Sequence, residues 1–222
     1  MSPFDYADVR SYYDHDYWNT PGVKSGYTNM SRSIGGDWHT QACGWLNSAI
    51  AVQGKTLLDA GCGLGHFMKA FDALGARVVG VDPSDYCVNF ITANVHLPVI
   101  QTTLEDMRQI GDNAFDLVYC GATLEHIPEE HLDLALRNLC RVTVPGGLLF
   151  LEIDTKPDEL RDTPEESHVN IKPWSMWLWD LSHPSHPWFI RDDLVDALHA
   201  CRDFPGFPLA DWSFIVLEKK RP

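Results

Sequence analysis

The sequence predicts an α/β fold in which helices cover both faces of a doubly wound, mostly parallel sheet. Five short apolar segments are rich in Val, Leu and Ile and are bounded by Gly, Pro or Asp, which is typical of strands buried on both faces. They are residues 55–60, 76–82, 97–103, 115–121 and 146–153. Residues 65–75 and 129–142 lie between such segments and carry apolar side chains every three or four positions, which predicts helices. This alternation indicates parallel strands joined by helical crossovers.

The segments that flank this core predict the rest of the organisation. Residues 1–36 are rich in Tyr, Asp, Gly and Ser, and we expect them to form a flap. Residues 37–222 are expected to form a single domain that opens with a helix over 37–53. Five prolines between 154 and 187 exclude one long helix there, so we expect an aromatic, substrate-side insert around 155–190.

Two further helices and a last strand are expected in the second half of the chain. Residues 175–181 predict a short helix inside the insert, and residues 191–201 predict another after it. Residues 211–220 have the composition of a strand. These elements complete the domain after the alternating core.

The composition favours a small-molecule or peptide substrate over nucleic acid. The 222 residues include 17 Lys and Arg against 31 Asp and Glu, a formal charge of −14, which leaves little positive surface to neutralise phosphates. Acidity that only aids solubility explains the charge equally well.

The cysteines and the apolar runs predict where the protein resides. The six cysteines include no Cys-x-x-Cys pair, and no run approaches the roughly 20 apolar residues that span a bilayer. The first residues lack the basic start and apolar centre of a signal peptide. We therefore expect a reduced, cytoplasmic protein without membrane attachment.

A glycine-rich loop follows the first predicted strand. Leu57 to Gly65 reads LLDAGCGLG, so Asp59 precedes glycines at 61, 63 and 65. A strand, such a loop and a helix bring backbone N–H groups to the carboxyl edge of a sheet, where open α/β folds bind ligands. Asp82 ends the next strand, where a carboxylate can accept both hydroxyls of a ribose. The loop lacks the Gly-x-Gly-x-x-Gly spacing of dinucleotide sites, and Asp59 is poorly suited to a pyrophosphate. Both carboxylates also suit a purely structural capping role.

Five motifs, in order, resemble those of the class I S-adenosylmethionine-dependent methyltransferases. They are LLDAGCGLG (57–65), VVGVDPS (78–84), TTLEDM (102–107), FDLVYCGATLEHIP (115–128) and RVTVPGGLLFLEI (141–153). The resemblance implies a Rossmann-like, seven-stranded sheet and S-adenosylmethionine as the cofactor. It places Asp59 near the amino group of the cofactor, the loop under its ribose and methionine parts, and Asp82 on the ribose. The implied cofactor site comprises Asp59, Ala60, Gly61, Gly63, Gly65, Asp82, Pro83, Thr103, Leu104, Glu105 and Cys120.

The adenine contact departs from the family pattern. The family often has an acidic residue where this chain has Thr103. Either Glu105 or Thr103 can accept from the adenine amino group, while the backbone N–H of Leu104 donates to the ring. A solvated helix start explains each side chain equally well.

Two histidines are the candidate catalytic residues. His126 follows Glu125 after the fourth strand, where the resemblance places the transferred methyl group, although a structural role is equally compatible. SHVNIKPWSMW (167–177) is similar to a pattern in methyltransferases of glycan or natural-product biosynthesis, which makes His168 the leading candidate base. The candidate substrate-binding residues are Tyr13, Tyr17, Trp18, Glu125, Trp174 and Trp177.

These motifs also have plainer interpretations. About half of the tryptophans are expected to pack against the sheet edge. His183 and His186, or the YDHD motif at 13–16, could hold a metal ion, but without a supporting cluster we expect no metal site.

The predicted activity is methyl transfer from S-adenosylmethionine to an O or N atom of a small molecule, with a glycan or natural-product intermediate among the candidates. We expect a monomer or homodimer. One alternative is a catalytically silent S-adenosylmethionine-binding accessory or sensor protein. Another is a nicotinamide-dependent dehydrogenase, which the loop spacing disfavours.

Overall fold

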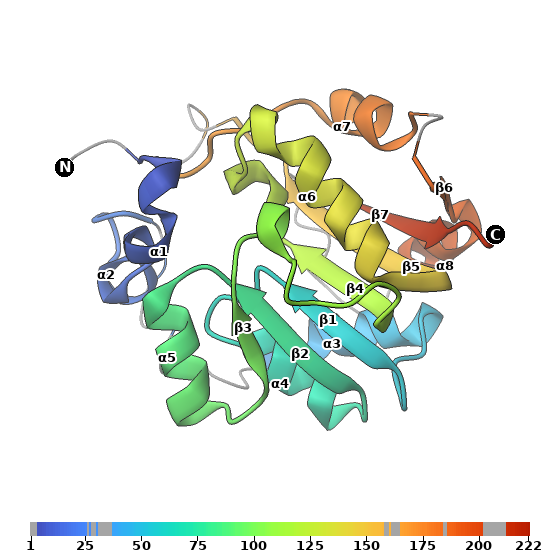
Figure 1. The fold of residues 1–222 in the computed structure, drawn as a ribbon, viewed down its shortest axis with the longest axis horizontal. Helices are drawn as coiled ribbons and strands as arrows, with labels where there is room; N and C mark the ends of the chain where they lie inside the picture. Colours follow the sequence, from blue (N-terminus) through green and yellow to red (C-terminus); the bar gives the residue numbers. More distant parts are fainter. Residues whose placement is uncertain are drawn as a thin grey trace.

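The computed structural model describes residues 4–25, 27, 30, 37–157, 160, 165–183, 186–201 and 212–222. In these residues one seven-stranded sheet has the order β3-β2-β1-β4-β5-β7-β6 (Figure 1). The first five strands pair in parallel, and β7 runs antiparallel to both β5 and β6. The strands are β1 (Thr56–Ala60), β2 (Arg77–Asp82), β3 (Val99–Gln101), β4 (Phe115–Gly121), β5 (Thr143–Asp154), β6 (Trp188–Ile190) and β7 (Trp212–Lys219).

Helices lie on both sides of this sheet, with α6 in front of it and α3 and α4 behind it in Figure 1. The α-helices are α1 (Val9–Tyr12), α2 (His15–Asn19), α3 (Asp37–Ala49), α4 (His66–Ala73), α5 (Asp85–Asn94), α6 (Glu129–Val142), α7 (Trp174–Leu181) and α8 (Asp192–Ala200). Three short 3₁₀ turns are η1 (Tyr6–Asp8), η3 (Leu104–Asp106) and η4 (Leu124–His126). None of the helices that the structure describes is long and apolar enough to cross a membrane.

The core consists of two apolar clusters, one on each face of the sheet. Successive residues of β1 pack on opposite faces of the sheet. Leu57 packs in the cluster that includes α3, α4 and α8, and Leu58 packs in the cluster that includes α6 and α7. Phe150 and its neighbour Leu149 divide in the same way on β5. Alternate side chains of a strand point to opposite faces, so near-continuous apolar runs are required here. The predicted doubly wound α/β fold is therefore confirmed.

Two features of the sheet differ from the sequence prediction. β5 begins at Thr143, three residues before the predicted segment, and the pairing with β4 shifts between Phe115 and Leu117. This irregularity accommodates Pro145, which has no N–H to donate to a regular ladder. β6 was not expected, because a three-residue edge strand is too short to show a periodic pattern.

The parallel strands end at one edge of the sheet and determine where the candidate residues lie. The glycine loop follows β1, Asp82 ends β2, and η4 follows β4. Gly61 and Cys62 both donate their N–H groups to the carbonyl of Val81, at 2.8 and 2.9 Å, which ties the loop to β2. Gly61 has φ +80°, and a Cβ built there would overlap the side chain of Thr123.

We expect Gly61→Ala to lower the free energy of unfolding by about 2–3 kcal/mol, because it combines a left-handed backbone with steric overlap. Chemical denaturation of the purified protein measures this change. Gly44→Ala is the matched control, since Gly44 lies within α3 with open space around its Cβ position. Its replacement should raise the free energy of unfolding by about 0.5–1 kcal/mol. Equal effects of the two substitutions would contradict this account.

Candidate active site

An open cavity lies at the carboxyl edge of the sheet. Its walls come from the glycine loop, the end of β2, the turns η3 and η4, and the N-terminal segment. The described residues that line it are Tyr6, Val9, Tyr13, Tyr17, Trp18, Tyr27, Gly61, Gly63, Val81, Asp82, Pro83, Thr103, Leu104, Ala122, Thr123, His126 and Ile127. None of these is Lys or Arg, so this lining offers no cationic side chain to a phosphate.

Asp82 is held in a fixed orientation in this wall. Its Oδ2 accepts from the N–H of Gly63 and its Oδ1 from the N–H of Ser84, both at 2.9 Å. Burial raises the pKa of the Asp82 carboxyl to about 6, although these two N–H groups oppose the shift. The carboxylate is therefore preorganised to accept further hydrogen bonds from a ligand.

Asp59 lies outside the cavity lining. It is 2 % exposed, and its Oδ2 has no hydrogen-bond partner among the described residues. Burial, and then the neighbouring Asp82, raise the pKa of Asp59 to about 8. Asp59 is therefore a buried group whose ionisation a nearby cation would favour.

The other predicted cofactor residues divide between the lining and the layer beneath it. Gly61, Gly63, Pro83, Thr103 and Leu104 line the cavity. Ala60 and Cys120 are fully buried at the ends of β1 and β4, outside the lining. Gly65 also lies outside it, and its Cβ position would face Ile91, Val95 and Met68.

Glu105 contacts the N-terminal segment instead of the cavity. Its Oε2 accepts from the hydroxyl of Tyr6 at 3.0 Å. Of the two candidate acceptors for an adenine amino group, Thr103 therefore lines the cavity and Glu105 does not.

The described part of the N-terminal segment, which was predicted to be a flap, lines one wall of the cavity. The Ser84 hydroxyl donates to the carbonyl of Tyr13 at 2.7 Å, and Arg10 lies 2.9 Å from Asp85. The indole of Trp18 packs against the loop, so a Cβ on Gly63 would lie only 2.8 Å from its ring. Tyr13, Tyr17 and Trp18 all line the cavity as predicted substrate contacts would. Residues 1–3, 26, 28–29 and 31–36 of the predicted flap lie outside the described residues.

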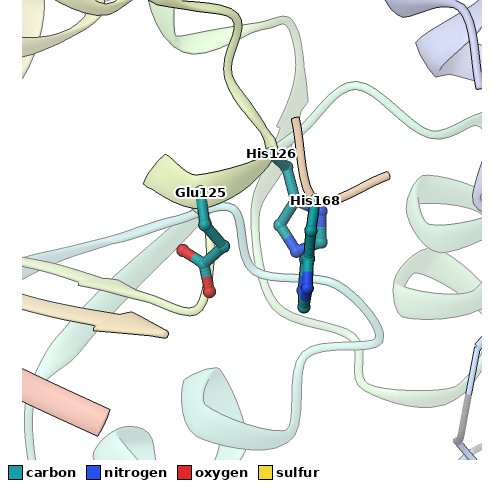
Figure 2. A group of neighbouring side chains, drawn as sticks. All are labelled: Glu125, His126 and His168. Carbon is teal, nitrogen blue, oxygen red and sulfur yellow. The ribbon is translucent and has the colours of Figure 1, made fainter. Parts of the chain in front are cut away.

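The two candidate catalytic histidines lie side by side at the end of the cavity formed by η4 (Figure 2). Their ring centroids are 4.8 Å apart. His126 lines the cavity, and its Nδ1 lies 3.1 Å from both the carbonyl oxygen and the hydroxyl of Ser167. Burial lowers the pKa of His126 to about 4. His126 is therefore neutral at pH 7, and a proton on Nδ1 donated to the carbonyl leaves the lone pair on Nε2.

Backbone hydrogen bonds hold residues 165–170 against η4. The N–H of Asn170 donates to the carbonyl of Glu125 at 2.9 Å, and its Nδ2 donates to the carbonyl of Ile127 at 3.1 Å. The carboxylate of Glu165 lies 3.6 Å from Nε2 of His168 and also accepts from the hydroxyl of Tyr17. These contacts bring His168 to His126 across 42 residues of sequence.

Glu125 lies beneath the histidines and does not line the cavity. Its side chain is fully buried, and its Oε1 accepts from the N–H of Asp154 at 3.3 Å. Its Oε2 has no hydrogen-bond partner among the described residues. Burial, above all other causes, raises the pKa of Glu125 well above its usual value.

The sequence around this site matches the model of a known protein family. Residues 58–151 match the model described as a methyltransferase domain, which covers the span from β1 through most of β5. The same span contains the glycine loop, Asp82 and η4. This part of the protein is therefore similar to the methyltransferase domain family.

The curated relatives match this chain over part of their length. The ubiquinone biosynthesis O-methyltransferase of Pseudomonas savastanoi pv. phaseolicola is 31 % identical over 111 residues, which are 48 % of this chain and 47 % of that protein. The chain therefore spans about half the length of the curated relatives it matches.

Solved structures share the methyltransferase fold at lower identity. An S-adenosylmethionine-dependent methyltransferase from Mesorhizobium loti has a TM-score of 0.57 and 17 % identity, over 81 % of this chain and 98 % of that chain. The [4+2]-cyclase SpnF has a TM-score of 0.61 and 18 % identity, over 97 % and 90 % of the two chains. These likenesses show the fold alone, and a shared fold does not determine the reaction.

The structure does not bring the two tryptophans predicted as substrate contacts to the cavity. Trp177 is fully buried in the core cluster beneath α7, where the ammonium of Lys172 lies 4.3 Å from its ring. Trp174 is partly buried against the same cluster. His183 and His186 lie at a separate hollow that α6 also lines.

Several lining residues were not predicted from the sequence. Tyr6 and Tyr27 lie in the aromatic segment that we expected to cover the site, so composition could have included them. Thr123 and Ile127 lie at the two ends of η4, on either side of the Glu-His pair, and both line the cavity. Glu165 has no local sequence signal, because its role depends on contacts with Tyr17 and the histidines.

We expect the affinity for S-adenosylhomocysteine to fall at low pH as Asp82 becomes protonated. Since the ionised carboxylate is the form that accepts ribose hydroxyls, its contribution is complete well above pH 6 and falls about tenfold per unit below pH 6. Isothermal titration calorimetry between pH 5 and 8 measures the trend. Asp59 also titrates here and its pKa depends in part on Asp82, so wild type is compared at each pH with Asp82→Asn and with Asp59→Asn. A constant ratio of the wild-type and Asp82→Asn affinities would contradict this prediction.

Proposed function

We propose that this protein transfers a methyl group from S-adenosylmethionine to an oxygen or nitrogen atom of a small molecule. The observation that carries the proposal is one continuous cavity, which has the glycine loop and Asp82 in one wall and His126 in another. A cofactor site and a group able to accept a proton therefore line the same cavity.

The charges in and around the cavity fit this cofactor. Bound S-adenosylmethionine supplies an electrophilic methyl group on a positively charged sulfur, and it also carries an ammonium group. Asp82 faces the cavity, Asp59 lies beneath it, and no Lys or Arg is among the described lining residues. These features support binding of a cationic nucleoside and disfavour a dinucleotide pyrophosphate.

We propose that the histidine pair handles the acceptor proton. An alcohol or phenol must lose its proton as the new bond forms, whereas a free amine needs less assistance. His126 is neutral, oriented by Ser167 and exposed to the cavity, so its Nε2 is suited to this task. His168 lies behind it, and the carboxylate of Glu165, 4.0 Å from Nδ1 of His126, favours the protonated form of His126.

The acceptor in this proposal is a flat, mostly apolar molecule that carries a hydroxyl group. The rings of Tyr13, Tyr17 and Trp18 line the cavity and provide surfaces for such a molecule. The relatives in Pseudomonas are ubiquinone biosynthesis O-methyltransferases, which is consistent with this class. Glycan and natural-product intermediates remain candidates within the proposal.

We also propose that residues 4–25 act as the flap over the acceptor. They contribute five of the described side chains of the wall, and hydrogen bonds tie them to Ser84 and Glu105. Closing the site in this way excludes water from the reacting groups.

The central test is binding followed by turnover. S-adenosylmethionine and S-adenosylhomocysteine should bind in calorimetry, and Asp82→Asn should weaken both by about 10- to 100-fold, equivalent to about 1.4–2.8 kcal/mol. Asp133→Asn, an exposed acid on α6, is the control and should bind as wild type does. Mass spectrometry across a panel of phenols, catechols and amines should then reveal a product with one added methyl group. Absence of binding would refute the proposal, and binding without any turnover would favour the silent accessory or sensor protein.

We expect His126→Gln and His168→Gln to lower kcat on a hydroxyl acceptor by about 10²- to 10⁴-fold, because each impairs proton removal. The affinity for S-adenosylhomocysteine should change less than threefold, roughly 0.7 kcal/mol. His199→Gln, on α8 beside Phe214, is the control variant. Unchanged turnover in both histidine variants would remove the pair from the mechanism.

A further inference from the structure

Three side chains with metal-ligating atoms converge at the η4 end of the cavity. Glu125 and His126 come from η4, and His168 comes from the segment that follows β5 (Figure 2). One potential ligand atom from each lies within 4.8 Å of the other two. Figure 2 shows the two imidazole rings next to each other, with the Glu125 carboxylate to one side. Among the described residues, no other trio of His, Cys, Asp or Glu is grouped in this way.

Two ligand atoms of this group remain available for an ion. Nδ1 of His126 is engaged by Ser167, which directs Nε2 away from that contact and toward a ligand. Metal-bound histidines typically donate their other N–H to a carbonyl or carboxylate in this manner. Oε2 of Glu125 is buried without a hydrogen-bond partner among the described residues. An unsatisfied buried carboxylate oxygen is costly, and a coordinated cation would satisfy it.

We propose that Glu125, His126 and His168 bind one divalent transition-metal ion. Two imidazoles and a carboxylate suit Zn²⁺, Fe²⁺, Co²⁺ or Mn²⁺, whereas Mg²⁺ and Ca²⁺ prefer oxygen ligands alone. Further coordination positions would be open to solvent or acceptor, since His126 lines the cavity.

The surrounding contacts would hold the ligands in place. Ligand distances of about 2.0–2.1 Å require ligand atoms about 3–3.5 Å apart, so a contraction of about 1.8 Å at most is needed from the present 4.8 Å limit. Side-chain rotation is enough for this, because Asn170 already fixes the two backbone segments against each other. Glu165 lies 3.6 Å from Nε2 of His168 and 4.0 Å from Nδ1 of His126, where it can orient the rings or complete the coordination.

The role of the ion rests on the proposed function. A coordinated acceptor hydroxyl becomes more acidic, so its proton can pass to solvent without a protein base. The oxygen–carbon bond then forms as the sulfur–carbon bond breaks, and the sulfur keeps the electron pair. No oxidation or reduction is involved. Binding of the ion itself requires neither cofactor nor acceptor.

The test is a direct metal titration of untagged protein after chelator treatment. We expect calorimetry to give one equivalent of Zn²⁺, Co²⁺ or Mn²⁺, and Mg²⁺ to bind at least tenfold more weakly. Glu125→Gln, His126→Gln and His168→Gln should each weaken transition-metal binding at least tenfold. Gln at 125 preserves an oxygen for the N–H of Asp154, and circular dichroism with thermal unfolding verifies that each variant is folded.

His183→Gln is the matched control, because His183 and His186 form a histidine pair at a separate hollow, with ring centroids 6.0 Å apart. It should bind the metals as wild type does. The proposal is overturned if no ion binds stoichiometrically, if the three variants bind as wild type does, or if His183→Gln abolishes binding.

S-adenosylhomocysteine titrations on the same samples distinguish failure of the metal site from failure of the proposed methyl transfer. Cofactor binding without metal binding refutes only the metal site, and the reverse result refutes only the proposed methyl transfer.

Discussion

The parallel pairing of β2, β1, β4 and β5 is the constraint on which the site depends. Because these strands run in one direction, their carboxyl ends meet at one edge, and the residues that follow them are brought together. Asp59, Asp82 and Glu125 are all buried there, and burial raises the pKa of each carboxyl group. Such a concentration of acidic groups in a low-dielectric environment is costly for the protein alone. A cationic ligand offsets that cost, which gives the cavity a preference that the fold by itself does not explain.

The sequence predicted the parts of the site that depend on local contacts. The glycine loop and Asp82 are each adjacent to a strand end, so strand assignment alone placed them in one wall. Thr103 and Leu104 were predicted from the resemblance of TTLEDM to a family motif, and both line the cavity. The loop also carries its own backbone requirement, because Gly61 must adopt a positive φ beside Thr123. Patterns of this kind need no knowledge of distant contacts.

The parts that depended on long-range packing were harder to predict. Trp177 lies on α7 and is fully buried. A short aromatic run does not reveal which of its rings face the core. Asn170 is separated from Glu125 by 45 positions, so its hydrogen bonds to η4 have no spacing signature. The expectation of no metal site came from motifs of adjacent residues. Glu125 and His168 form a group only after the chain has folded.

The environment of His126 is compatible with both proposed roles for it. A proton acceptor must be neutral at the working pH and must present a defined nitrogen to the substrate, and a metal ligand must meet the same conditions. Burial keeps the imidazole neutral, and Ser167 determines which nitrogen faces away from the segment 165–170. The two roles differ in what lies beyond Nε2, an acceptor hydroxyl or an ion. Because the unsatisfied oxygen of Glu125 lies in the same cluster, the ion explains one more feature than the base does.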